Sequence, residues 1–245
     1  MKLTVKHYYF LGNKSKDVNG NLISSTSWDA VRIDDENGNK SPFSIPGNRE
    51  EWVKKCLNHE PMAKRAEAIN NFINKNNFKK VISLGAGACF MEYNLKAQNP
   101  SIYLECSDFS PQSIARLGEV FLEANKIEVV DLLKEEFKNV DKEALYLLHR
   151  IDTDFNDKQW QDIFMRMNKA GINNILFVPC DISTPWSLLK EQLSCLYQIV
   201  FRGSKLSFVG YLRTRDRFIS LFEKFYNLSQ EFQVADLIGF YLKKK

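Results

Sequence analysis

Glycine and acidic residues stand at the ends of short apolar runs in this sequence, where they could hold a nucleotide-like ligand. Gly85, Ala86 and Gly87 follow one run, and Asp108 and Asp131 close the next two. Glycines after a strand let the backbone turn tightly and approach a ligand closely. A carboxylate at the end of the second strand can accept hydrogen bonds from both hydroxyls of a ribose. Asp108 follows Gly85 by 23 residues (108 − 85), close to the ~20 expected for that role.

A histidine closes the fourth apolar run and could act as a general base. His149 has this place, whereas His7 and His59 lie far from it in the chain. An imidazole titrates near neutral pH, so it can take a proton from a hydroxyl. An alternative catalytic group is a cluster of carboxylates.

Asp152, Asp154 and Asp181 are that cluster, and carboxylates are ligands that magnesium prefers. We favour a solvated loop, in which Asp154 or Asp157 caps the following helix, and predict no metal site.

The apolar runs themselves predict a parallel sheet. Strands are expected at 81–84, 102–106, 127–130, 144–148 and 175–178, alternating with helical stretches. Runs this apolar indicate strands buried on both faces. Two final strands near 228–234 and 237–243 are close enough to form an antiparallel hairpin at the sheet edge. The fold class is therefore α/β, a mostly parallel sheet with an antiparallel C-terminal hairpin and helices on both faces.

The two ends of the chain differ from this alternating core. Residues 1–60 are expected to form an N-terminal arm or lid, rich in turn signals up to residue 47, and 61–245 the main domain. A further helix is expected from about Asp216 to Tyr226. Residues 183–214 combine aromatic and basic side chains, predicted as a helix near 184–200 and a basic, aromatic connection. The candidate ligand-binding side chains of this insertion are Trp186, Arg202, Tyr211 and Arg213.

Composition narrows the range of partners. The net charge of +4 suits an anionic small molecule but is too small for a nucleic-acid-binding stripe, so no nucleic acid is expected. The five cysteines are scattered, without a CxxC pair, which argues against a zinc knuckle or a disulfide framework. No apolar run reaches the ~18 residues of a membrane span. We expect a cytoplasmic protein, either a monomer or a homodimer, with no membrane partner.

Three segments resemble the class I S-adenosylmethionine (SAM) dependent methyltransferases, over about residues 62–245. Val81 to Gly87 resembles their first motif, Cys106 to Ser110 the end of their second strand, and Val129 to Leu132 their adenine-contacting segment.

The resemblance implies a Rossmann-like sheet with SAM as cofactor. Gly85 and Gly87, with Ala86 between them, would line its methionine half. Asp108 would hold the ribose and Phe109 would pack on adenine. Asp131 would bond the adenine amino group, with Leu132 against the ring.

Two residues depart from the family pattern. Ser83 replaces the usual acid two residues before the first glycine, which leaves the amino group of SAM to backbone carbonyls. Cys89 replaces the third glycine, a milder change since cysteine is small. A nicotinamide dehydrogenase, the rival interpretation, needs glycine where Phe90 stands, and phenylalanine would block the close helix–strand packing.

The resemblance favours an enzyme, a methyltransferase acting on an oxygen of a small molecule, with His149 as base. A sugar or phosphorylated metabolite of surface-glycan or secondary metabolism suits the insertion, which would roof the acceptor pocket. An RNA or protein methyltransferase, or a non-catalytic nucleotide-binding module, stays open. The (Asn/Asp)-Pro-Pro-aromatic motif of many amino-directed nucleic-acid methyltransferases is absent. Pro179-Cys180 follows the fifth strand, not the fourth where the cytosine-C5 methyltransferase nucleophile lies.

Overall fold

A seven-stranded sheet organises the computed structural model, which describes residues 1–11, 44–203 and 205–245. The strand order is β4-β3-β2-β5-β6-β9-β8. The first five of these strands run parallel, and β9 and β8 add an antiparallel pair at one edge. The strands are β2 (Lys80–Leu84), β3 (Tyr103–Asp108), β4 (Lys126–Val129), β5 (Leu145–His149), β6 (Asn174–Val178), β8 (Tyr226–Val234) and β9 (Leu237–Lys244).

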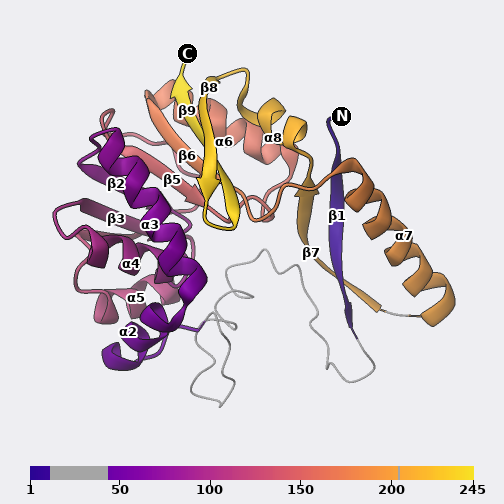
Figure 1. Ribbon diagram of the computed structural model, residues 1–245, viewed down its shortest axis with the longest axis horizontal. Helices are drawn as coiled ribbons and strands as arrows, with labels where there is room; N and C mark the ends of the chain where they lie inside the picture. Colours follow the sequence, from indigo (N-terminus) through magenta and orange to yellow (C-terminus); the bar gives the residue numbers. More distant parts are fainter. Residues whose placement is uncertain (12–43, 204) are drawn as a thin grey trace.

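Helices cover both faces of this sheet (Figure 1). One layer consists of α2 (Arg49–Asn58), α3 (Glu60–Lys75), α4 (Phe90–Gln98) and α5 (Pro111–Val120). The opposite layer consists of α6 (Asp157–Ala170) and α8 (Arg215–Phe222). Each layer buries its own apolar cluster against the sheet. The central strand β5 contributes to both clusters, which explains why its sequence is apolar without alternation.

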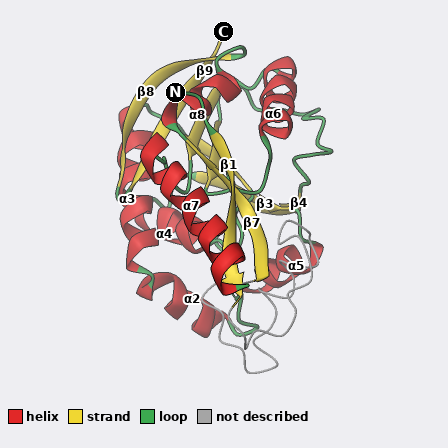
Figure 2. Cartoon of the chain, turned by 90° about the vertical axis from the view of Figure 1, so that its right-hand side faces the viewer, coloured by secondary structure: helices red, strands yellow, loops and turns green. Residues whose placement is uncertain are grey.

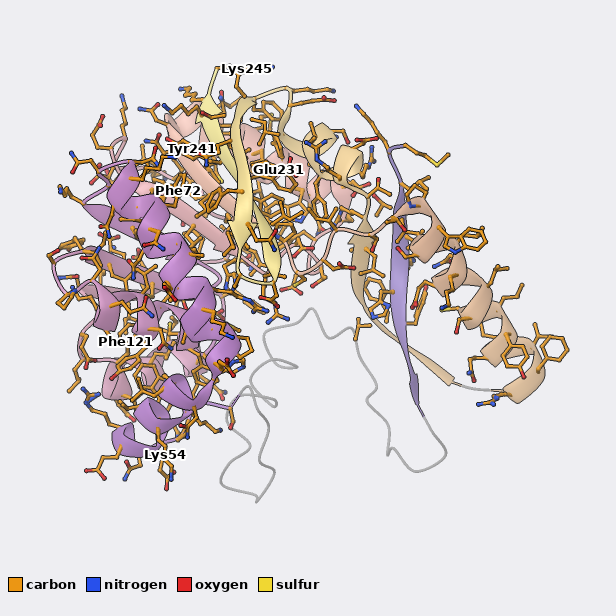
Figure 3. All side chains as sticks on the ribbon, viewed as in Figure 1. Lys54, Phe72, Phe121, Glu231, Tyr241 and Lys245 are labelled. Atoms are coloured by element: carbon orange, nitrogen blue, oxygen red, sulfur yellow. The ribbon has the colours of Figure 1, made fainter. Side chains whose placement is uncertain are left out.

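Aromatic rings fill the core on both sides of the sheet. Phe72 of α3 packs on the hairpin, with its ring centroid 4.7 Å from Phe232 and 4.9 Å from Tyr241; Figure 3 labels Phe72 and Tyr241. On the other side Trp160 of α6 lies 5.0 Å from Phe177 of β6. Buried aromatic side chains each remove a large apolar area from water, so these contacts fix the layers on the sheet.

The predicted α/β sheet with its antiparallel hairpin is confirmed. One helix is shorter than expected, because α8 ends at Phe222 and Tyr226 already begins β8. The basic, aromatic connection predicted after the insertion helix is a strand.

That strand, β7 (Lys205–Arg213), pairs antiparallel with β1 (Thr4–Leu11) in a separate two-stranded ribbon. Helix α7 (Pro185–Arg202) lies against the ribbon on its outer side (Figures 1 and 2). Thr184 and Ser187 form a capping box at its start, and Gly203, with φ of 58°, ends it. The ribbon therefore joins the start of the chain to residues near its end.

The described residues just before position 61 pack in the core of the main domain. Ile45, Trp52 and Cys56 are fully buried in the main core, so residues 44–60 belong to the sheet's helical layer. Residues 12–43, most of the predicted arm, lie outside the described residues. None of the helices in the described part of the chain has the length and apolar character of a membrane span.

Candidate functional site

The turn after β2 is shaped by three residues with positive φ: Gly85 (73°), Gly87 (62°) and Cys89 (57°). A Cβ on Gly85 would come within 2.8 Å of Cγ2 of Ile151, which follows β5. Glycine at position 85 is therefore required by both backbone conformation and space. Trp52 of α2 braces the loop from outside, since its Nε1 donates a 3.1 Å hydrogen bond to the carbonyl of Ala88.

Asp108 joins this glycine loop to the end of β3. Its carboxylate accepts hydrogen bonds from the backbone N–H of Gly87 (3.0 Å) and of Ser110 (3.1 Å), and the residue is 1% exposed. The amide of Ala86 donates to the carbonyl of Ser107, which adds a second link. The loop and the acid, distant in sequence, thus form one rigid unit at the carboxyl ends of β2 and β3. It lies beside the point where the strand order reverses, between β2 and β5, which is the usual ligand site of open α/β sheets.

A buried glutamate contacts Ser83, the residue that stands where the family pattern has an acid. Ser83 Oγ donates a 2.7 Å hydrogen bond to Glu92 Oε1, and Glu92, in the first turn of α4, is 2% exposed. Burial raises the pKa of Glu92 to about 7, against the effect of the Ser83 hydrogen bond. No salt bridge of Glu92 occurs among the described residues. The sequence analysis did not single out Glu92. An acidic residue at the start of the helix that follows the glycine loop could have indicated it.

The residues predicted around adenine stand at the ends of β3 and β4. Phe109 is half-buried and Leu132 is 5% exposed. Asp131 accepts the amide of Leu133 (3.0 Å) and pairs with Lys134 at 2.9 Å. Asp131 therefore organises its own turn, and its predicted contact with a base stays a prediction.

At the end of β5 two polar side chains have buried atoms without a hydrogen-bond partner in the described structure: His149 Nε2 and Arg150 Nε. Arg150 also has a φ of 59°, a conformation that costs a non-glycine residue free energy and is common at functional sites. Burial, then Arg150 and Arg65, lower the pKa of His149 to about 3. The imidazole is therefore neutral at physiological pH, and a weaker base than its ordinary pKa suggests.

The carboxylates weighed as a magnesium site have other partners. Asp152 Oδ1 accepts the amide of Cys180 at 2.6 Å, and Asp181 Oδ2 accepts the hydroxyl of Ser183 at 3.1 Å. Burial raises the pKa of Asp152 to about 6. No group of three metal-ligating side chains occurs in the ranges that the structure describes. The expected capping by Asp154 or Asp157 is wrong: Asn156 caps α6, in a box with Gln159.

The predicted ligand-binding residues of the insertion separate into two groups. Tyr211 lies at the strand ends, because its amide donates to the carbonyl of Thr153 at 3.1 Å. Arg213 is fully buried and donates to Asp157 (2.7 Å) and to the carbonyl of Asp152 (2.6 Å). Its guanidinium therefore fastens the ribbon to the main domain, a structural role that the sequence analysis did not foresee.

Trp186 and Arg202 make up the second group, at opposite ends of α7. Trp186 is 72% exposed, and Arg202 lies over the ring of Tyr197 at 5.9 Å. The ribbon stands between α7 and the main sheet (Figure 1). The structure does not bring these two side chains to the loop and strand ends, and their contact with an acceptor stays a prediction.

Comparisons by sequence give no match, either to family models or among curated proteins. Solved structures with a similar fold include human N-acetylserotonin methyltransferase in complex with SAM, with a TM-score of 0.51 and 19% identity. The match covers 80% of this chain and 60% of the human enzyme, so this chain spans less than two thirds of it.

Two further solved structures are similar in fold. A putative O-methyltransferase from Nostoc punctiforme PCC 73102 matches with a TM-score of 0.55 and 15% identity, covering 79% of this chain and 60% of that one. The PH0226 protein from Pyrococcus horikoshii OT3 matches with a TM-score of 0.54 and 16% identity, covering 86% of this chain and 99% of that one. With the strand order and the glycine loop, these likenesses establish that the chain has the fold of the class I SAM-dependent methyltransferases.

Proposed function

We propose that this protein is a SAM-dependent methyltransferase that transfers a methyl group to an oxygen of a small-molecule acceptor. The observation that supports this best is the unit formed by the glycine loop and Asp108, beside the switch point between β2 and β5. Phe90 stands where a nicotinamide-binding loop needs glycine, so a dehydrogenase is disfavoured.

In this proposal Asp108 accepts hydrogen bonds from the ribose and the glycine loop lines the methionine half of SAM. Glu92 serves the amino group in place of the missing acid at Ser83. A buried carboxylate without a cation is costly, and a cationic group bound beside it would recover much of that cost. SAM itself supplies an activated methyl group, so the protein has to align the acceptor and accept its proton.

The acceptor would lie at the end of β5. His149 is the proposed base, and its low pKa makes it effective only if a bound negative charge raises its basicity. Arg150, with its unpartnered Nε, suits an anionic acceptor such as a phosphorylated sugar, because guanidinium binds phosphate or carboxylate through a planar fork. Tyr211 on the ribbon would form part of the wall.

Titration calorimetry with SAM, S-adenosylhomocysteine and NAD tests this proposal. We expect the first two to bind and NAD not to bind, and saturation at ~100 times the dissociation constant to stabilise the fold by about 2.7 kcal/mol. Binding of NAD alone would overturn the proposal. Mass spectrometry of small molecules that co-purify, incubated with SAM, would then identify the acceptor by a gain of one methyl group.

A non-catalytic nucleotide-binding module is the second candidate. The altered first motif, with Ser83 and Cys89, favours it. It predicts nucleotide binding without turnover of SAM on any acceptor in the same mass-spectrometric assay.

A further inference from the structure

Helix α7 carries a concentration of exposed apolar side chains. Eight of the fourteen large hydrophobic residues that are exposed in the described structure belong to it, with exposed fractions from 48% to 74%. They are Trp186, Leu189, Leu193, Leu196, Tyr197, Ile199, Val200 and Phe201. Exposure of single hydrophobic residues is ordinary, but a continuous apolar stripe on one helix marks an interaction surface.

The spacing of the stripe is that of a helix–helix seam. Trp186, Leu189, Leu193, Leu196 and Val200 follow each other at intervals of three, four, three and four residues. This alternation is the a/d pattern of a heptad repeat, which keeps apolar side chains in line toward a second helix. Two heptads are long enough to pair along the whole of α7.

The chain's own ribbon already occupies the other side of α7. Leu188 and Cys195 are buried there. Glu191 bonds His7 Nδ1 at 2.8 Å, and the side-chain amide of Gln192 donates to the carbonyl of Lys6 at 3.2 Å. The five residues spaced at three and four therefore face away from the ribbon, and Figure 2 shows α7 in front of the ribbon.

The exposed area is sufficient for a stable contact. Taking the usual side-chain areas, the eight residues expose on the order of 800 Å² per copy, which is about what one partner contributes to a standard protein interface. The largest apolar patch of an ordinary monomer is ~300–600 Å².

We propose that α7 is a dimerisation helix, and that the stripe is covered by α7 of a second copy of this chain in antiparallel orientation. None of the eight exposed residues is charged, and Lys190 lies beside them on the same face of the helix. An amphipathic membrane helix usually has rows of lysine and arginine beside its apolar face, whereas α7 has only Lys190 and Arg202.

Three features favour antiparallel over parallel pairing: the placement of the two main domains, the position of Lys190 and the helix dipoles. The two-fold axis would pass near Leu193, the middle of the stripe, and the two main domains would lie at opposite ends of the helix pair. Lys190 of one copy would then lie beside Tyr197 of the other, away from its own counterpart. Antiparallel helices also bring the positive end of each macrodipole near the negative end of the other.

Light scattering and sedimentation velocity over low to high micromolar concentration test the proposal. We expect the wild type to be a dimer, and the double variant Leu193→Glu/Leu196→Glu to dissociate at least ~100-fold more readily, as for loss of central hot-spot residues. The matched control is Leu57→Glu on α2, since Leu57 and Leu196 are both 57% exposed. This control should remain a dimer. Circular dichroism and SAM titration check that each variant is folded.

Cysteine cross-linking tests the orientation without disturbing the fold. Leu193→Cys should form an intermolecular disulfide on mild oxidation. Val200→Cys should not, because in the antiparallel pair the two positions are ~21 Å apart along the axis, beyond disulfide reach. Cross-linking of both variants would indicate a parallel pair and overturn the proposed arrangement. A wild type that is monomeric throughout overturns the dimer, as does a monomer that binds phosphatidylserine vesicles through α7. None of these measurements depends on methyl transfer.

Discussion

At Glu92 the chain keeps a carboxylate where water is excluded and where no described salt bridge balances it. Proteins rarely retain such a group for stability, since a well-packed neutral residue does better. Because the Glu92 carboxylate lies beside the glycine loop, our proposal assigns it to the amino group of SAM.

Glu92→Gln should therefore stabilise the free protein above pH 7 and weaken SAM binding by roughly 10–100-fold, the loss of one hydrogen bond to a charged group. Burial raises the pKa of Glu92 from 4.5 to about 7, so between these pH values the folded protein binds more protons than the unfolded chain. Its contribution to the free energy of unfolding then falls by about 3 kcal/mol as pH rises through this window. Urea denaturation of the wild type and of Glu92→Gln at pH 5 and pH 8 measures this contribution as the difference between the two proteins.

The same residue gives a binding test. Of the groups facing Glu92, the thiols Cys89 and Cys106 have raised pKa values and stay neutral, and Asp108 is the remaining carboxylate. Wild-type affinity for SAM should fall as pH drops from 7.5 to 5.5, while Glu92→Gln shows a flat profile. A pH-dependent variant would place the cationic contact elsewhere.

Asp108→Ala should weaken SAM binding by about 1.5–3 kcal/mol. Because Asp108 also holds the amide of Gly87, part of this loss comes from a looser loop. Calorimetry on Asp108→Asn, which keeps one acceptor oxygen for the loop but no charge, separates the two effects. Unchanged affinity in both folded variants would show that the ribose is held by another group.

His149→Ala should lower turnover by ~10²–10⁴-fold with SAM affinity close to wild type. Since the pKa of His149 is about 3 before an acceptor binds, the imidazole should cause no acidic limb near pH 6.5 in kcat/KM for the acceptor. His7→Ala on the ribbon is the control and should retain activity. Loss of activity on treatment with EDTA, but not in His149→Ala, would instead point to a metal.

At the scale of single elements, two glycines differ in what their positions require. The turn after β2 needs glycine at position 85, whereas helix α5 does not need glycine at position 118. Gly85→Ala should destabilise the protein by about 1–3 kcal/mol, because φ is 73° and the new Cβ would meet Ile151. Gly118→Ala, in α5 with open space around it, should stabilise by roughly 0.5–1 kcal/mol. Thermal unfolding of the two variants gives the comparison; equal effects would mean that the loop has room to adjust.

Helices and strands could be predicted from the sequence where neighbouring residues alone determine the backbone conformation. Val81 to Leu84 is apolar and ends in glycine, so both the strand and its turn could be predicted. The ends of α8 and the nature of β7 could not, because Tyr226 and Lys205 enter strands only by pairing with β9 and β1. Of the site, the loop and Asp108 were identifiable by spacing. Glu92 was not, since its link to Ser83 is a tertiary contact.

At the scale of the whole molecule, one buried ion pair attaches the ribbon to the main domain. Asp157 accepts hydrogen bonds from Arg213 and Arg217 and from the hydroxyl of Thr4. Burial raises the pKa of Asp157, but these partners outweigh it, and the pKa is lowered overall. Start, middle and end of the chain meet at this carboxylate.

Arg213→Lys should destabilise the protein by about 3–5 kcal/mol, since lysine cannot reproduce the fork of hydrogen bonds at a fully buried site. Arg215→Lys is the neighbouring control: its pair with Glu231 is half exposed, so the loss should stay below ~1 kcal/mol. Urea unfolding measures both, and hydrogen exchange in β1 should quicken only in Arg213→Lys. Equal losses would contradict the fastening role of Arg213.

The ribbon also sets an order of events during synthesis on the ribosome. Strand β1 emerges about 200 residues before β7, its only strand partner in the described structure. At ~5–20 residues per second, the backbone groups of β1 wait roughly 10–40 s for a ladder to join. An early strand with open edges is prone to pair with other chains. Nascent protein should thus need protection by a chaperone until residue 213 has left the exit tunnel, even though the parallel core can already have formed.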